Sequence, residues 1–171
     1  PFVPPIDTIA QFEGPVLHSA AYRRRELYTG QRVAVIGGGC SAMEIALELA
    51  SVCREVLLIT RSDRQFANLP TTIRHIKGVV LSFASHAIRV LMANGNVVVE
   101  FTQLSTVIFA TGYQFNLDFL DPNCGIKVGP EQTLHGLYHH LMSIEHPTMA
   151  IFNVLRNVSP LPLVHQQVGI R

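Results

Sequence analysis

Gly37, Gly39 and Ala42 are spaced as G-x-G-x-x-A, a pattern typical of a turn that holds the pyrophosphate of a dinucleotide. The first glycine permits a tight turn, the second lets a phosphate approach the backbone, and the small third residue lets a helix pack on a strand. The flanking residues support this interpretation. Val33–Ile36 is apolar, as in a strand buried on both faces, and apolar residues recur at helical spacing over Met43–Ala50. We therefore predict a strand, a glycine turn and a helix whose free N–H groups face a pyrophosphate.

The residues after the next strand indicate which dinucleotide binds. Glu55–Thr60 reads EVLLIT, a second short strand, and its end is the point at which such folds meet the adenosine ribose. An acidic residue there would bind the free 2′-hydroxyl of NAD, but Arg61 and Ser62 follow instead. A guanidinium fork and a hydroxyl both suit a phosphate monoester, so the pattern predicts NADP(H). Asp63, one residue further along, keeps NAD open.

Further strands follow from apolar residues at a period of two or in short continuous runs. They are expected at Val16–Leu17, Val79–Phe83, Ile88–Met92, Val97–Phe101 and Thr106–Ala110. Asn94-Gly95 is a strong hairpin signal between two of them. Pro70–Thr72 offers a weak helix start, and the sequence as far as Lys77 is ambiguous.

These elements predict an α/β fold, a Rossmann-like nucleotide-binding domain with a β-meander insertion. The sequence after Tyr113 has a different texture, with turns and two expected short strand regions, near Leu137–Leu141 and Thr148–Val154. This stretch does not close a domain by itself.

The composition excludes several classes of protein. A net charge of +1 argues against a nucleic-acid binder, and no apolar run approaches the ~18 residues of a membrane span. Three cysteines without a CxxC motif argue against a disulfide framework and favour a reducing compartment. His135, His139 and His140 have no cysteine or carboxylate at ligand spacing, so no metal site is predicted. Apolar residues make up 48% and charged residues only 15%, which suits a piece of a larger protein whose surface other domains cover.

Three separated motifs resemble those of flavin-containing monooxygenases. Phe12-x-Gly14-x-x-x-His18-x-x-x-Tyr22 matches the identifying motif of that family. The glycine loop follows at the family's spacing, with Ala42 in place of its usual glycine. Phe109-Ala110-Thr111-Gly112-Tyr113 is similar to the motif after which the family's chain returns to its FAD domain.

The resemblance implies a division of the chain and a set of cofactor-binding residues. It divides the chain into a linker with the identifying motif at 1–25, an NADPH-binding domain at 26–110 and a partial FAD-domain return segment at 111–171. The residues that it places at the cofactors are Gly37, Gly39, Cys40, Ser41, Ala42, Arg61, Ser62, His18, Thr111, Gly112 and Tyr113. Within this set, His18 either packs at a domain junction or positions a cofactor, and Cys40 either fills a small-residue slot or contributes a thiol. Thr111–Tyr113 is equally open between a structural and a functional role.

The resemblance also implies an activity. Members of the family use NADPH and FAD to form a flavin C4a-hydroperoxide, which oxygenates a soft nucleophile, an amine nitrogen or a sulfide sulfur. The chemistry belongs to the cofactors, so no catalytic side chain is predicted. The implied partners are O2, a small amine or sulfide substrate and the missing FAD-domain segments, and a homodimer stays open. The fragment is expected to be inactive alone and cytoplasmic, with membrane association through another part of the protein left open.

Two other functions remain compatible with the residues. One is an NAD(P)H-dependent flavin reductase of the pyridine-nucleotide–disulfide type, which shares the fold arrangement, although the absence of CxxC and the Phe12-to-Tyr22 motif count against it. The other is a non-catalytic NADP-binding or scaffold fragment.

Overall fold

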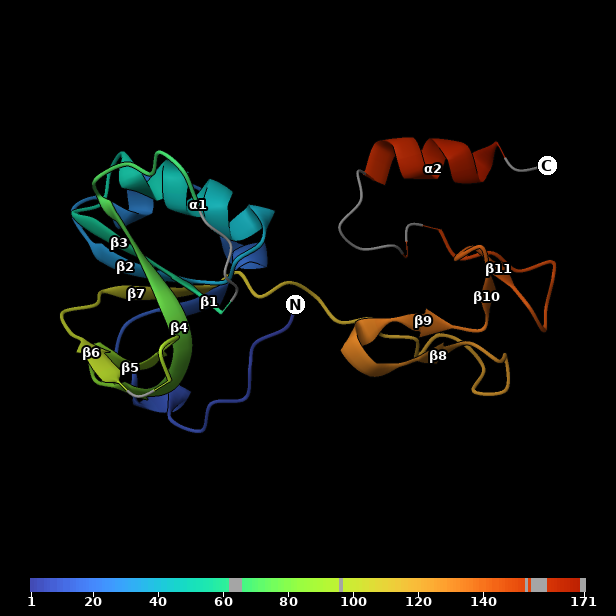
Figure 1. Ribbon diagram of the computed structural model, residues 1–171, viewed down its shortest axis with the longest axis horizontal. Helices are drawn as coiled ribbons and strands as arrows, with labels where there is room; N and C mark the ends of the chain where they lie inside the picture. Colours follow the sequence, from blue (N-terminus) through green and yellow to red (C-terminus); the bar gives the residue numbers. More distant parts are fainter. Residues whose placement is uncertain (62–65, 96, 153, 155–159, 170–171) are drawn as a thin grey trace. The chain divides into compact units, whose positions relative to one another are not determined.

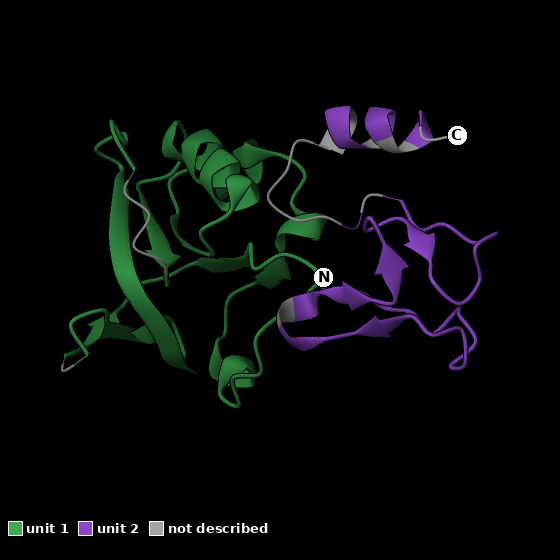
Figure 2. Ribbon diagram, turned by 45° about the vertical axis from the view of Figure 1, so that its right-hand side comes forward, with its two compact units in different colours: residues 1–113 green, residues 114–171 purple. Residues whose placement is uncertain are grey.

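The computed structural model describes residues 1–61, 66–95, 97–152, 154 and 160–169. The chain divides into two compact units, residues 1–113 and residues 114–171 (Figure 2).

The first unit is built on one sheet of seven strands among the residues that are described. Its order is β1-β7-β2-β3-β4-β5-β6 (Figure 1). The strands are β1 (Val16–His18), β2 (Arg32–Ile36), β3 (Glu55–Thr60), β4 (Ile73–Ala84), β5 (Ala87–Met92), β6 (Val98–Phe101) and β7 (Thr106–Phe109). Neighbours from β1 through β4 pair in parallel, whereas β4, β5 and β6 form an antiparallel meander. The predicted α/β fold with a meander insertion is confirmed.

Helix α1 (Cys40–Ala50) covers one face of the parallel strands. Its buried residues Ala42, Ile45, Ala46 and Leu49 form one hydrophobic cluster with residues of β2 and β3, among them Val33, Val35, Val56 and Leu58. The apolar positions of the helix recur at three- and four-residue spacing, which places them on one side. The helix starts at Cys40, after the short turn that follows the carboxyl end of β2 at Ile36.

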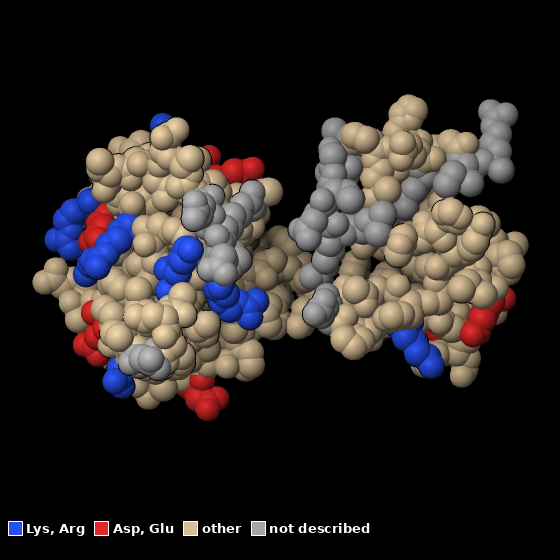
Figure 3. Space-filling model, in the orientation of Figure 1, with Lys and Arg blue, Asp and Glu red and all other residues tan. Residues whose placement is uncertain are grey.

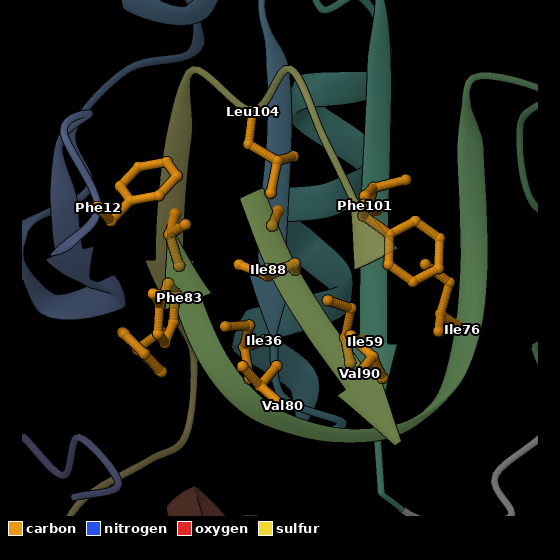
Figure 4. Close-up of a cluster of buried hydrophobic side chains, with 14 residues drawn as sticks. Phe12, Ile36, Ile59, Ile76, Val80, Phe83, Ile88, Val90, Phe101 and Leu104 are labelled. Carbon is orange, nitrogen blue, oxygen red and sulfur yellow. The ribbon is translucent and has the colours of Figure 1, made fainter. Parts of the chain in front are cut away.

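The meander covers the opposite face of the same strands. Ile36 of β2 and Ile59 of β3 pack with Val80, Ile88 and Val90 of the meander in a second cluster (Figure 4). Parallel strands covered on both faces read as continuous apolar runs, which accounts for the sequences VAVI and VLLI. Much of the apolar content of the chain is thus used inside this one unit.

Strand β4 starts at Ile73, six residues before the expected Val79. Its first half pairs in parallel with β3, from Val56↔Ile73 to Thr60↔Lys77. The ambiguous segment before Gly78 is therefore strand and not helix, because pairing with a neighbour decides its state where the local pattern does not. A bulge between Val80 and Ser82 then shifts the register against β5.

The segment before β2 is ordered against the rest of the sheet. It holds β1, which pairs with β7, and three 3₁₀ helices, η1 (Ile9–Gln11) before that strand and η2 (Ser19–Ala21) and η3 (Arg25–Tyr28) after it. Residues 1–25 thus belong to the same compact unit as the sheet, and this unit extends to Tyr113. The division into NADPH and FAD domains stays a prediction.

The second unit consists of short elements. They are β8 (Lys127–Val128), η4 (Pro130–Gln132), β9 (Leu134–His135), β10 (Leu137–Tyr138), β11 (Met142–Ser143) and α2 (Pro160–Val168). Strand β8 pairs with β9, and β10 pairs with β11, both antiparallel. The strand expected at 148–154 is reduced, within its described part, to a single bridge between Met142 and Ala150. Among the helices whose residues are described, none is both long and apolar enough to cross a membrane.

Candidate functional site

The glycine turn is fixed across three neighbouring strands. The N–H of Gly37 donates to the carbonyl of Ile59 at 2.9 Å, and the N–H of Ala110 donates to the carbonyl of Ile36 at 2.8 Å. Gly37 has φ of +146°, and a Cβ built there would lie 2.1 Å from the carbonyl oxygen of Ala110. Both the backbone angle and the space require glycine at this position.

Helix α1 begins with its amide groups open to an anion. Gly39 is its N-cap, with extended backbone and no side-chain cap, and nothing lies within 4 Å of a Cβ placed there. Cys40 and Ser41 in the first turn are exposed, whereas Ala42, on the side of the helix that faces the sheet, is fully buried. Uncapped N–H groups, a positive dipole end and room for close approach are the features that hold a pyrophosphate, so the residues present fit a dinucleotide.

The tip of β3 carries a cation. Thr60 is buried, and its hydroxyl forms a hydrogen bond of 2.9 Å with Nε2 of His75 on β4. Arg61 follows directly and is exposed. Ser62, the other residue expected at this tip, lies outside the described part of the chain. Arg61 thus stands at the tip of β3, and its contact with a 2′-phosphate stays a prediction.

His18, the last residue of β1, is hydrogen-bonded to the residues that follow β7. Its Nδ1 accepts from the N–H of Ala20 at 3.1 Å, so Nε2 carries the proton and donates to the carbonyl of Gly112 at 2.9 Å. Its ring also meets the ring of Tyr113 edge-on, with centroids 5.4 Å apart. His18 is buried and uses both ring nitrogens in the protein, which favours a positioning role over direct contact with a cofactor.

The N-terminus of the chain is hydrogen-bonded to the residues that follow β7. The N–H of Phe2 donates to the carbonyl of Gly112 at 2.8 Å, and the hydroxyl of Thr111 donates to the carbonyl of Phe2. The Gly112 carbonyl thus accepts two hydrogen bonds, one from Phe2 and one from His18. Gly112 itself has φ of +79°, which favours glycine. Thr111 and Gly112 are held in place, and Tyr113 projects with 57% of its surface exposed.

A cleft of about 250 Å³ lies between η2 and the start of α1. It is lined by Ser19, Tyr22, Ser41, Glu44, Ile45, Glu48 and Tyr113. The Tyr22 hydroxyl donates to Glu48 at 2.8 Å, and the Tyr22 ring stacks on Tyr28 with centroids 5.7 Å apart. Burial and the bond to Glu48 raise the pKa of Tyr22 above its ordinary value.

The cleft brings together some predicted residues and leaves others apart. Ser41 and Tyr113 both line the cleft. The ring of His18 contacts the ring of Tyr113. Arg61 is not among its lining residues. Ser19, Glu44 and Glu48 were missed by the sequence reasoning. The only signal for the glutamates is their spacing of four on the polar side of the helix, which is equally typical of a solvated face.

Comparisons with known proteins match residues of both units. The sequence profile of the family described as pyridine nucleotide-disulphide oxidoreductase matches residues 4–149. The chain is 27% identical to the thiol-specific monooxygenase of Saccharomyces cerevisiae, over 90% of this chain and 37% of that protein. It is also 27% identical to the senecionine N-oxygenase of Tyria jacobaeae, over 91% of this chain and 34% of that protein.

Solved structures agree on the fold. The S-allyl-L-cysteine S-oxygenase of Allium sativum superimposes with a TM-score of 0.77 at 23% identity, covering 98% of this chain and 38% of that one. The thioredoxin reductase of Lactococcus lactis gives a TM-score of 0.72 at 16% identity, covering 97% and 59%. Oxygenases and reductases thus share this fold. The chain spans about a third of the length of the curated relatives it matches.

Proposed function

Because the chain belongs to the pyridine nucleotide-disulphide oxidoreductase family, we propose that it is the NADPH-binding part of a flavin-dependent monooxygenase. Its curated relatives include proteins named as a thiol-specific monooxygenase and an N-oxygenase. The proposed substrates are accordingly small soft nucleophiles, an amine nitrogen or a sulfide sulfur, with O2 as the second substrate. The remaining partners are segments that complete the FAD domain.

One observation carries this proposal more than any other. The uncapped start of α1 stands at the carboxyl end of β2, and Arg61 occupies the tip of the neighbouring strand β3. A pyrophosphate at the first position brings an adenosine ribose to the second in a fold of this type. An arginine there suits a 2′-phosphate, whereas an acidic residue would suit a free 2′-hydroxyl.

Each residue of the site has a role in this function. Bound NADPH would supply a hydride, and bound FAD would supply the centre that activates oxygen. Gly37 and Gly39 shape the cradle, and the first-turn amides near Ser41 hold the pyrophosphate. Tyr113 stands at the mouth of the cleft, where it shields a bound nucleotide from water, and His18 fixes it there through Gly112.

A calorimetric titration of the chain with NADP⁺ and with NAD⁺ tests the cofactor assignment. We expect NADP⁺ to bind and NAD⁺ to bind at least about tenfold more weakly, the effect of one charge-assisted interaction with the 2′-phosphate. Equal affinity for both nucleotides would contradict the assignment of Arg61. Absence of binding to either would remove the proposed function.

A reductase is the second candidate, because the fold is shared with thioredoxin reductase. The two functions differ in the product that forms as NADPH is consumed. In the longer protein that would carry this chain with its FAD domain, an oxygenase converts a thioether to a sulfoxide in proportion to the NADPH and O2 consumed. A reductase consumes NADPH without oxygenated product, so product analysis by mass spectrometry separates them.

A further inference from the structure

Strand β4 brings a lysine to the tip of β3. The two strands run in parallel, and their last paired residues are Thr60 and Lys77. Parallel neighbours lie about 4.8 Å apart, so Lys77 stands one strand away from the residue that precedes Arg61. The Lys77 carbonyl accepts from the N–H of Ala93 at 2.9 Å, which fixes its backbone at that level.

The side of the sheet on which Lys77 lies follows from strand alternation. Ile73 of β4 belongs to the cluster under α1, so His75 and Lys77, two and four residues later, lie on that same face. On β3, Val56 and Leu58 belong to that cluster, and alternation adds Thr60. The 2.9 Å hydrogen bond between Thr60 and His75 agrees with this arrangement. Lys77 therefore lies on the face of the sheet that carries the glycine loop and α1.

The positive charge of Lys77 acts on His75, which is hydrogen-bonded to Thr60 at the end of β3. Lys77 is half-buried. The pKa of His75 is lowered by burial and, secondly, by the positive charge of Lys77. Figure 3 shows several Lys and Arg side chains on the visible face of the first unit, with Asp and Glu side chains among them. A cation held by the sheet next to an exposed arginine makes the end of β3 and β4 more positive than Arg61 alone would.

We propose that Lys77 is a second specificity-determining residue for the dinucleotide and acts with Arg61 on the 2′-phosphate of NADP(H). This inference rests on the proposed function, since it concerns the same bound nucleotide. A phosphate monoester carries between one and two negative charges at neutral pH, so two cations match it better than one. Arg61 supplies a planar fork from a position that follows the strand, and Lys77 supplies a compact charge from within the strand. NAD lacks the group on which both act.

Titration of a Lys77→Met variant tests this role, because methionine retains most of the apolar stem and removes the charge. We expect its affinity for NADP⁺ to fall about tenfold or more, with the affinity for NAD⁺ changed less than about twofold. Lys77→Arg, which keeps the charge, should retain most of the NADP⁺ affinity. The matched control is Lys127→Met in the second unit, which should leave both affinities unchanged. Circular dichroism checks that each variant is folded.

A labelling experiment on the unmodified chain provides a test that needs no variant. The sequence holds only two lysines, Lys77 and Lys127. Acetylation with an excess of NADP⁺, followed by mass spectrometry, should show slower modification of Lys77 and unchanged modification of Lys127. NAD⁺ should protect Lys77 less.

The outcomes separate this inference from the proposed function. If Arg61→Ala weakens NADP⁺ selectively but Lys77→Met leaves both nucleotides unchanged, or weakens both equally, the role of Lys77 is overturned and the proposed function stands. Equal protection of Lys77 by NADP⁺ and NAD⁺ overturns it as well. If the unmodified chain binds neither nucleotide, the proposed function fails and the inference fails with it.

Discussion

The hydroxyl of Tyr22 donates a hydrogen bond of 2.8 Å to Oε2 of Glu48, and this bond joins the segment between β1 and β2 to helix α1. The contact gives the tyrosine at the end of the Phe12-to-Tyr22 motif a structural role in this chain. It also closes one side of the cleft at the start of α1.

Removal of the hydroxyl in Tyr22→Phe should lower the free energy of unfolding by about 1 kcal/mol, because the bond to Glu48 is lost while the stacking on Tyr28 remains. Urea denaturation measures the change. Tyr138→Phe, at a tyrosine that is 62% exposed, is the control and should have no effect. The raised pKa of Tyr22 means that its neutral form is favoured in the folded state. The stabilisation that comes from protonated Tyr22 is therefore full below pH 10.0 and decreases as the pH rises above that value. Tyr22→Phe should reduce this decrease in the free energy of unfolding.

Gly37 and Gly39 should respond differently to the same substitution. Gly37→Ala places a Cβ 2.1 Å from the Ala110 carbonyl at φ of +146°, so we expect it to destabilise the fold by roughly 2 kcal/mol or more. Gly39→Ala meets nothing within 4 Å and should leave thermal stability nearly unchanged. Its methyl group points into open space at the helix start, so it should weaken NADP⁺ binding. A stable Gly37→Ala protein would contradict the geometry of the turn.

Arg61→Ala should weaken NADP⁺ binding by about 1.5–3 kcal/mol and leave NAD⁺ binding nearly unchanged, the scale of a hydrogen bond to a charged group. Calorimetry measures both constants. Arg54→Ala is a matched control, since Arg54 is also an exposed arginine but precedes β3 at its opposite end. Equal losses for both nucleotides would show that Arg61 supports the fold and does not recognise a 2′-phosphate.

The stability of the chain should depend on His75 in mildly acidic solution. Burial and the charge of Lys77 lower its pKa from 6.5, so the unfolded chain binds a proton more readily than the folded chain. Stability is thus full above pH 6.5 and falls as the pH drops through and below that value. His75→Gln, which keeps a hydrogen-bonding partner for Thr60, should reduce this slope by up to about 1.4 kcal/mol per pH unit.

The cysteines should differ in reactivity. Cys40 is exposed at the start of α1, whereas Cys53 is buried and burial raises its pKa to about 11. Alkylation with iodoacetamide at pH 8 should modify Cys40 first and reach Cys53 only on unfolding, because the thiolate is the reacting form. NADP⁺ should slow the reaction of Cys40, which mass spectrometry can follow. Reaction of Cys40 at the same rate with and without the nucleotide would contradict its placement beside the pyrophosphate.

Local patterns predicted the centre of the fold and failed where pairing or backbone reversal decides the structure. β2 and β3 were expected to within a residue because their apolar residues are continuous, and the helix between them was expected from apolar residues at helical spacing. The single strand expected near Leu137–Leu141 is two, because His139 and His140 both adopt positive φ between them. Helix α2 was not expected, although Pro160 stands where proline favours a helix start.

The candidate site was predictable to the extent that one motif carries it. The glycine loop and Arg61 follow from sequence spacing alone. The cleft does not, because it depends on η2 reaching α1 through Tyr22 and Glu48, residues 26 apart in sequence. The register that brings Lys77 beside Thr60 could not be predicted either, because it depends on the pairing of β3 with β4.

The double role of β4 restricts how this region can change in evolution. Its first half belongs to the parallel sheet and its second half to the meander, with one irregularity between Val80 and Ser82. Insertion of one residue between Ile73 and His75 would turn His75 and Lys77 to the opposite face. Length differences among homologues should therefore gather in the hairpin turn at Asn94-Gly95. Alignments of this segment should be gap-free from Ile73 to Val80.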